Sequence, residues 1–187
     1  MTVSFDPPPE PASGAGADMI YYVSDGSGPP PWHVRDQEAR ILALPPCAAV
    51  PADRAGLTPV ALGPYAATLW LPDLAVAEPM DVPDATWQGW DWPSGDSLTL
   101  SAHRMPGLPG LYALEGYAPG TCRAALAGRP VSVWRWSQED ADGTLHHRAV
   151  VGGFLDDATA FYAGVVAGSP EGRDALLAAL LTLAPRP

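Results

Sequence analysis

The chain has 187 residues, of which 47% are hydrophobic and 17% charged, so it is long enough for one globular domain and is not a disordered polypeptide. Its 21 acidic and 10 basic residues give a formal net charge of -11, which disfavours nucleic-acid and anionic-membrane binding and favours a basic partner. Its 23 prolines and 19 glycines require many turns, because neither residue suits the interior of a helix or a central strand.

Hydropathy and cysteine spacing give a first expectation about the compartment. No stretch approaches the roughly 20 apolar residues that cross a membrane, and "MTVSFDPPPEP" lacks the charged and apolar regions of a secretory signal. We therefore expect a cytoplasmic protein without membrane contact. Cys47 and Cys122 belong to no CxxC motif, so two free thiols are favoured over one long-range disulfide.

The first part of the chain is rich in proline and glycine. Residues 1–18 contain "PPPEP" and "SGAGA", which predict a flexible arm, and residues 19–187 are expected to form a single domain. Met19–Val23 is typical of a short strand. His33–Ala43 contains good helix formers, but its apolar residues are unevenly spaced, so helix and strand both remain open.

The central part predicts strands separated by breakers. Ala66–Leu71 is typical of a strand stopped by Pro72, and a long loop containing "EPMDVPD" follows. Trp90 and Trp92 lie on one side of an extended run, "PSGD" supplies a turn, and "SLTLSAH" alternates apolar and polar residues. This pattern predicts a hairpin with one buried face.

The next part predicts a short helix and a meander. "TCRAALAG" indicates a helix over Cys122–Ala127, with Thr121 as its N-cap and Gly128 as its stop. "RPVSVWRWSQ" and "LHHRAVVGGFL" read as paired strands joined through Asp142-Gly143, a type I′ signature. Thr159–Ala167 completes a three-stranded antiparallel meander.

The C-terminal segment Ser169–Ala184 predicts an amphipathic helix. Ser169 is a suitable N-cap, Pro170 suits the first turn, and Glu171 and Asp174 lie near the positive end of the helix dipole. The residues expected on its apolar face are Leu176, Leu177, Leu180 and Leu183. The order of elements predicts the α+β class, with an antiparallel sheet of about five to seven strands covered by this helix.

The part of the chain from Thr121 to Leu183 resembles the second half of the PsbP-like fold group. The resemblance rests on "GRPVSVWRW", "HRAVVGGFL", "AFYAGVVAGSPE" and "LLAALLTL", in which strands lead through a Gly-Ser-Pro turn into a closing helix. It covers about a third of the chain and includes no catalytic motif. What it implies is a noncatalytic sandwich that binds another protein.

No motif for catalysis or metal binding is present in the sequence. His146 and His147 are adjacent, so on a strand they point to opposite faces, and no HxH, HExxH or CxxC pattern occurs. There is no GxSxG nucleophile motif, and Asp156 and Asp157 are typical of a solvated turn. We therefore expect no catalytic residue, no metal ligand and no cofactor.

The tryptophans are the candidate binding residues. Two indoles spaced by two on a strand can form a flat apolar shelf for a ligand or can pack inside the fold. The candidates are Trp90, Trp92, Trp134 and Trp136. The function that the sequence favours is a noncatalytic accessory protein, chaperone-like or inhibitor-like, that binds a basic protein. The alternatives are a carbohydrate or small-ligand module using a tryptophan shelf, and an enzyme whose site forms no motif.

Overall fold

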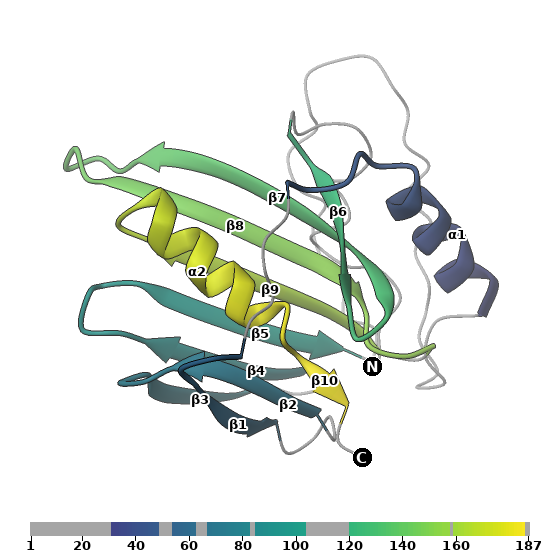
Figure 1. The fold of residues 1–187 in the computed structure, drawn as a ribbon, viewed down its shortest axis with the longest axis horizontal. Coiled ribbons are helices and arrows are strands. Elements are labelled where there is room, and N and C mark those ends of the chain that lie inside the picture. Colours follow the sequence, from purple (N-terminus) through teal and green to yellow (C-terminus); the bar gives the residue numbers. More distant parts are fainter. Residues whose placement is uncertain are drawn as a thin grey trace.

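The computed structural model describes residues 31–48, 54–62, 67–82, 85–103, 120–157 and 159–185 (Figure 1). These residues form two helices and ten strands. In chain order the elements are α1 (Pro31–Leu42), β1 (Leu57–Leu62), β2 (Ala67–Pro72), β3 (Val76–Val82), β4 (Ala85–Asp91), β5 (Ser97–His103), β6 (Cys122–Leu126), β7 (Arg129–Glu139), β8 (Leu145–Phe154), β9 (Ala160–Ala167), α2 (Pro170–Leu180) and β10 (Ala184–Pro185).

The strands form two antiparallel sheets. The larger has the order β3-β4-β5-β9-β8-β7-β6, and the smaller has the order β1-β2-β10. The predicted α+β class is confirmed, as is the meander, because β7, β8 and β9 are neighbours in that sequence. The predicted arm over residues 1–18 and the predicted strand Met19–Val23 lie outside the described residues.

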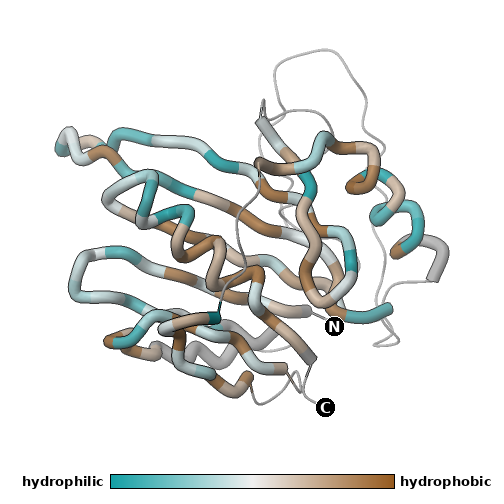
Figure 2. Tube along the Cα trace, in the orientation of Figure 1, coloured by the Kyte–Doolittle hydropathy of each residue, from teal (hydrophilic) through white to brown (hydrophobic). Residues whose placement is uncertain are grey.

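Helix α2 begins where its sequence predicts, but it ends at Leu180, earlier than the predicted end at Ala184, which belongs to β10. Ser169 is extended, with φ -144° and ψ 158°, and its Oγ accepts the backbone N–H of Gly172 at 3.0 Å. The helix changes from hydrophilic residues in its first turns to hydrophobic residues near its end (Figure 2). Its buried residues are Leu176, Leu177, Ala179 and Leu180, and Leu183, which follows the helix, is buried in the same core. They bury α2 against β2, β8 and β9.

The main core lies between the larger sheet and the layer formed by α2 and the smaller sheet, both of which lie in front of it in Figure 1. Leu69 and Leu71 of β2 enter this core from the smaller sheet, and Phe161 of β9 enters it from the larger one. Ala160 precedes Phe161 and so faces the other way, where it packs with Val34 of α1 in a second cluster. Helix α1 therefore covers one end of the opposite face.

Several local expectations are confirmed. The segment His33–Ala43, left open between helix and strand, is helical up to Leu42 as part of α1. The strand expected over Ala66–Leu71 is β2, which runs from Ala67 to Pro72. The hairpin predicted around "PSGD" joins β4 to β5, where the N–H of Trp92 donates to the carbonyl of Asp96 at 3.0 Å. Gly95 supplies the positive φ of 84° that this turn requires.

The helix predicted over Cys122–Ala127 is wrong, because this segment forms strand β6. Leu126 pairs with Arg129 across a two-residue turn in which Ala127 and Gly128 have φ of 50° and 82°. Two successive positive φ values make a tight hairpin that turns the chain straight into β7. Helix-forming residues are overridden here by pairing with a long neighbouring strand.

Two further expectations about turns are corrected. The segment containing "EPMDVPD" is not a long loop, since Val76–Val82 pairs with β4 as edge strand β3, a position that tolerates Pro79. The β7–β8 connection is not a two-residue type I′ turn. Glu139 pairs with Leu145, and Gly143 donates its N–H to the carbonyl of Asp140 at 3.0 Å, so the loop is longer.

Candidate functional site

Two of the four candidate tryptophans help to build the core. Trp90 is 2% exposed and packs with Leu98 and other core residues. Trp92 is partly buried against the same core, and its Nε1–H donates to the carbonyl of Pro72 at 3.4 Å. These indoles connect β4 and its turn to the smaller sheet, so Trp90 is inaccessible to a ligand in the folded protein.

The other two tryptophans lie on the opposite face of the larger sheet. Val133 enters the main core, so the alternation of β7 directs Trp134 and Trp136 away from it, and both are half-buried. Their rings stack with centroids 4.1 Å apart and planes 19° apart. Each indole therefore covers one face of the other, and the pair does not form the coplanar shelf expected from the sequence.

A polar network borders this stacked pair. Arg148 is the cross-strand partner of Trp136, and its Nη2 lies 3.6 Å from Oδ1 of Asp140. The other carboxylate oxygen of Asp140 lies 3.0 Å from Nε2 of His146. The Nε of Arg148 is enclosed without a hydrogen-bond partner in the described part of the chain. These contacts connect β8 to the loop that follows β7.

One edge of the larger sheet is covered and the other is open among the described strands. At β6, the segment Pro45–Cys47 runs alongside the strand, with Pro46 bridged to Arg123. At β3, no described strand lies beyond the edge. The corner where β2 turns into β3 exposes two large apolar side chains, since Leu74 is 77% exposed and Val76 is 63% exposed.

Leu74 is also strained. Its φ is 70°, in the left-handed region that disfavours side chains with a Cβ, and this costs about 1 to 2 kcal/mol. An apolar side chain that is 77% exposed gains little from burial in the free protein, so burial does not offset this strain. Backbone strain of this kind is concentrated at functional sites.

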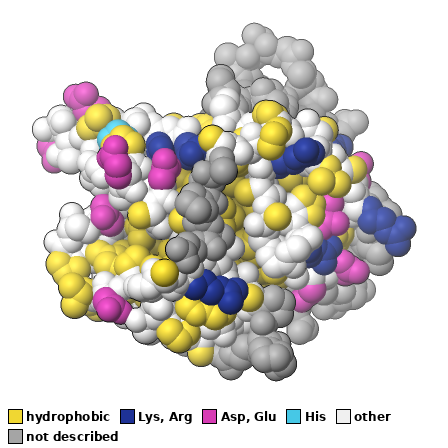
Figure 3. Space-filling model, viewed as in Figure 1, with side chains coloured by type: hydrophobic (Ala, Val, Ile, Leu, Met, Phe, Trp, Pro, Cys, Tyr) yellow, Lys and Arg dark blue, Asp and Glu magenta, His cyan; other side chains and the backbone are white. Residues whose placement is uncertain are grey.

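Acidic residues surround these apolar side chains. Asp91 pairs across the strands with Val76 and is exposed, and Asp73 precedes Leu74 and accepts a hydrogen bond from the Thr58 hydroxyl. Neither carboxylate forms an ion pair within the described residues. Figure 3 shows the face of the molecule that carries α2 and the smaller sheet, where hydrophobic side chains gather at the lower left with acidic side chains near them. We call Asp73, Leu74, Val76 and Asp91 the Leu74 corner.

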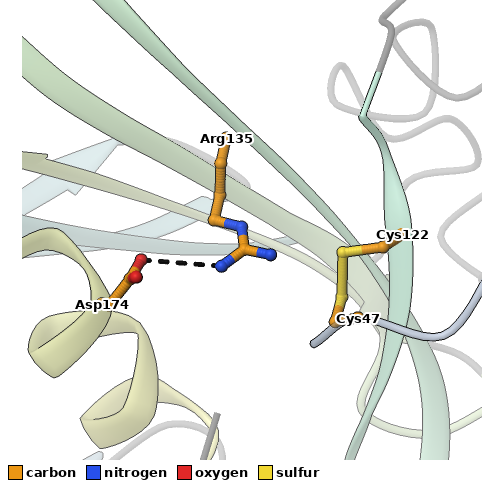
Figure 4. Close-up of a disulfide and its surroundings, with 4 residues drawn as sticks. All are labelled: Cys47, Cys122, Arg135 and Asp174. Atoms are coloured by element: carbon orange, nitrogen blue, oxygen red, sulfur yellow. Dashed lines mark ion pairs between the residues drawn. A yellow bond between two sulfur atoms is a disulfide. The ribbon is translucent and has the colours of Figure 1, made fainter. Parts of the chain in front are cut away.

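The cysteines lie elsewhere, on the α2 side of the sheet, and the expectation of two free thiols is wrong. Cys47 and Cys122 form a disulfide across 75 residues of sequence, with their Cα atoms 4.8 Å apart (Figure 4). The physical reason is the path of the chain after α1, which runs along β6 and so places Cys47 beside Cys122. Arg135 of β7 points into the space between this disulfide and Asp174 of α2.

The described residues contain a serine–histidine contact but no complete catalytic or metal-binding group. Ser137 Oγ lies 2.8 Å from Nδ1 of His147, the residue opposite it on β8, and no described carboxylate forms an ion pair with His147. No three His, Cys, Asp or Glu side chains of the described residues are placed to hold a metal ion. Neither described helix is long and apolar enough to cross a membrane.

Comparison of the chain with protein-family models and with curated proteins finds no match to either. The PsbP-like resemblance of Thr121 to Leu183 therefore stays a prediction. Sequence reasoning missed both the Leu74 corner and the disulfide. A leucine after "PD" carries no signal of positive φ, and the approach of the cysteines depends on strand order.

Proposed function

We propose that the protein is a noncatalytic binding protein whose Leu74 corner takes a basic segment of a partner protein. The observation that carries this proposal is the exposed and strained Leu74 beside exposed Val76. Burying one such side chain contributes about 1.5 to 3 kcal/mol, so a partner that covers Leu74 and Val76 gains this free energy on binding. The two carboxylates and the net charge of -11 favour a basic rim around the partner's apolar contact.

The edge of β3 favours recognition through side chains over continuous strand addition. Pro79 lies in the middle of this strand and has no N–H to donate, so an added strand would lack one rung of its ladder. Contact with the side chains of the turn before β3 does not require backbone N–H groups, so Pro79 does not limit it. We therefore place the partner's apolar side chain against Leu74 and Val76, with its basic residues near Asp73 and Asp91.

The test is a comparison of binding and stability at position 74. Leu74→Asp should abolish capture of the partner from native lysate, whereas Leu42→Asp, which changes a leucine 53% exposed at the end of α1, should retain it. Leu74→Gly is the sharper variant. Because glycine accepts positive φ, it should keep or raise stability and still lose binding.

Association with the wild-type protein should also slow as salt rises, because the carboxylates accelerate encounter. Capture of the same proteins by wild type, Leu74→Asp and Leu74→Gly would refute the proposed surface.

The carbohydrate alternative now rests on Trp134 and Trp136 alone. Their mutual stacking leaves each indole one outer face, which favours contact with an edge or a single ring over a flat sugar. A glycan panel that shifts the tryptophan fluorescence of the wild type but not of Trp136→Ala would support this alternative. A cytoplasmic location remains part of the main proposal, and in that compartment dithiols would act on the Cys47–Cys122 disulfide.

A further inference from the structure

The two sulfurs of the disulfide differ in accessibility. Cys122 is 7% exposed and belongs to the main core, whereas Cys47 is partly exposed and packs against the outside of that core. A thiolate attacks a disulfide along an accessible sulfur. An incoming reductant would therefore meet Cys47 first, with Cys122 as the leaving group.

A positive charge faces this disulfide. In Figure 4 the guanidinium of Arg135 lies between the carboxylate of Asp174 and the two cysteines. Arg135 Nη1 is 3.7 Å from Oδ1 of Asp174, but the same oxygen lies 2.9 Å from Nε of Arg173. Two guanidinium groups share one carboxylate, so a net positive charge remains on the side of Asp174 that faces the disulfide in Figure 4. A neighbouring arginine stabilises a thiolate and lowers the pKa of the thiol.

The backbone holds the two cysteines together independently of the sulfur bond. The N–H of Cys47 donates to the carbonyl of Arg123 at 2.9 Å, and the N–H of Arg123 donates to the carbonyl of Pro45 at 2.8 Å. These bonds do not involve the sulfur atoms, so we expect them to persist when the disulfide opens. The reduced thiols would then stay opposed, and the disulfide could close again without refolding.

We propose that Cys47–Cys122 is a reversible dithiol–disulfide couple whose substrate is a dithiol. Arg135 stabilises the cysteine thiolates that form when the disulfide opens. One thiolate of the dithiol attacks Cys47 Sγ, forming a mixed disulfide and releasing Cys122 as a thiolate. The second thiolate of the dithiol then attacks the dithiol sulfur that is bonded to Cys47, and Cys47 leaves as a thiolate. Two electrons pass to the protein, the dithiol becomes a cyclic disulfide, and the cysteine thiolates take up protons according to pH. This site is separate from the Leu74 corner.

The experiment is a redox titration of the folded protein in mixtures of reduced and oxidised dithiothreitol at pH 8, with alkylation to count free thiols. The wild-type disulfide should open fully without denaturant and close again on oxidation. In Arg135→Gln the equilibrium constant for reduction should fall about 3- to 10-fold, because a thiol pKa change of about 0.5 to 1 has that effect. Arg135→Lys, which keeps the charge, should remain closer to wild type. Arg40→Gln, in an exposed ion pair with Asp36 on α1, is the matched control.

A second measurement separates the role of the charge from a role in packing. In Cys122→Ser, the pH dependence of iodoacetamide alkylation gives the pKa of Cys47, which should rise when Arg135→Gln is added. If Cys122→Ser does not fold, the titration of Arg135→Gln still decides, since it retains both cysteines. A disulfide that opens only in denaturant, or an equal equilibrium constant in wild type and Arg135→Gln, would overturn the proposal.

Discussion

Leu180→Ala is the most direct test of the packing of α2 on the sheets. Leu180 is fully buried in the main core, and its helix contacts β2 of the smaller sheet together with β8 and β9 of the larger one. The substitution removes three carbon atoms, each worth about 0.8 kcal/mol of transfer free energy, or roughly 2.4 kcal/mol in total. Two sheets and a helix enclose the site and resist collapse, so the cavity adds to this cost. We expect a loss of about 3 to 4 kcal/mol.

The assay is equilibrium unfolding in urea, followed by tryptophan fluorescence and by circular dichroism. The midpoint should fall while the slope m stays constant, because the surface exposed on unfolding hardly changes. Leu145→Ala, at a leucine 49% exposed on β8, is the matched control and should lose less than about 0.5 kcal/mol. A loss below about 1 kcal/mol in Leu180→Ala would refute the placement of α2 over the core.

Alanine should cost very different amounts of stability at two adjacent glycines of β8, and the carboxyl of Asp142 should have a lowered pKa. A Cβ at residue 153 would lie 2.8 Å from Cγ1 of Val131, whereas a Cβ at residue 152 would meet nothing closer than 3.6 Å. Gly153→Ala should therefore cost about 1 to 3 kcal/mol in urea unfolding and Gly152→Ala much less, and equal costs would contradict this geometry. The backbone N–H of Thr144 donates to the carboxylate of Asp142 and lowers its pKa below the ordinary value of 3.8. The hydrogen bond therefore makes a small contribution to stability above pH 3.8, which is lost as the pH falls through the lowered pKa of the folded protein. An Asp142 titration midpoint at or above 3.8, measured by NMR, would contradict this prediction.

The sequence by itself determined the features that depend on neighbours along the chain. Ser169 and Pro170 begin α2 because a cap and a first turn are local, and the leucine spacing sets its buried face. The alternation "SLTLSAH" defined β5, and the paired apolar runs after residue 130 defined the meander and hence the α+β class. A period of two or 3.6 residues is visible without knowledge of the rest of the fold.

Tertiary structure decided the features that depend on which segments meet. Cys122–Leu126 forms a strand because its backbone hydrogen-bonds to β7. Cys47 lies next to Cys122 because the chain after α1 runs along that same strand. The two tryptophan pairs have the same spacing but different environments. Trp90 faces the smaller sheet and the core, whereas Trp134 lies on the opposite face of the larger sheet. Alternation assigns residues to two faces of a strand, but only the packing of the sheets determines which face is buried.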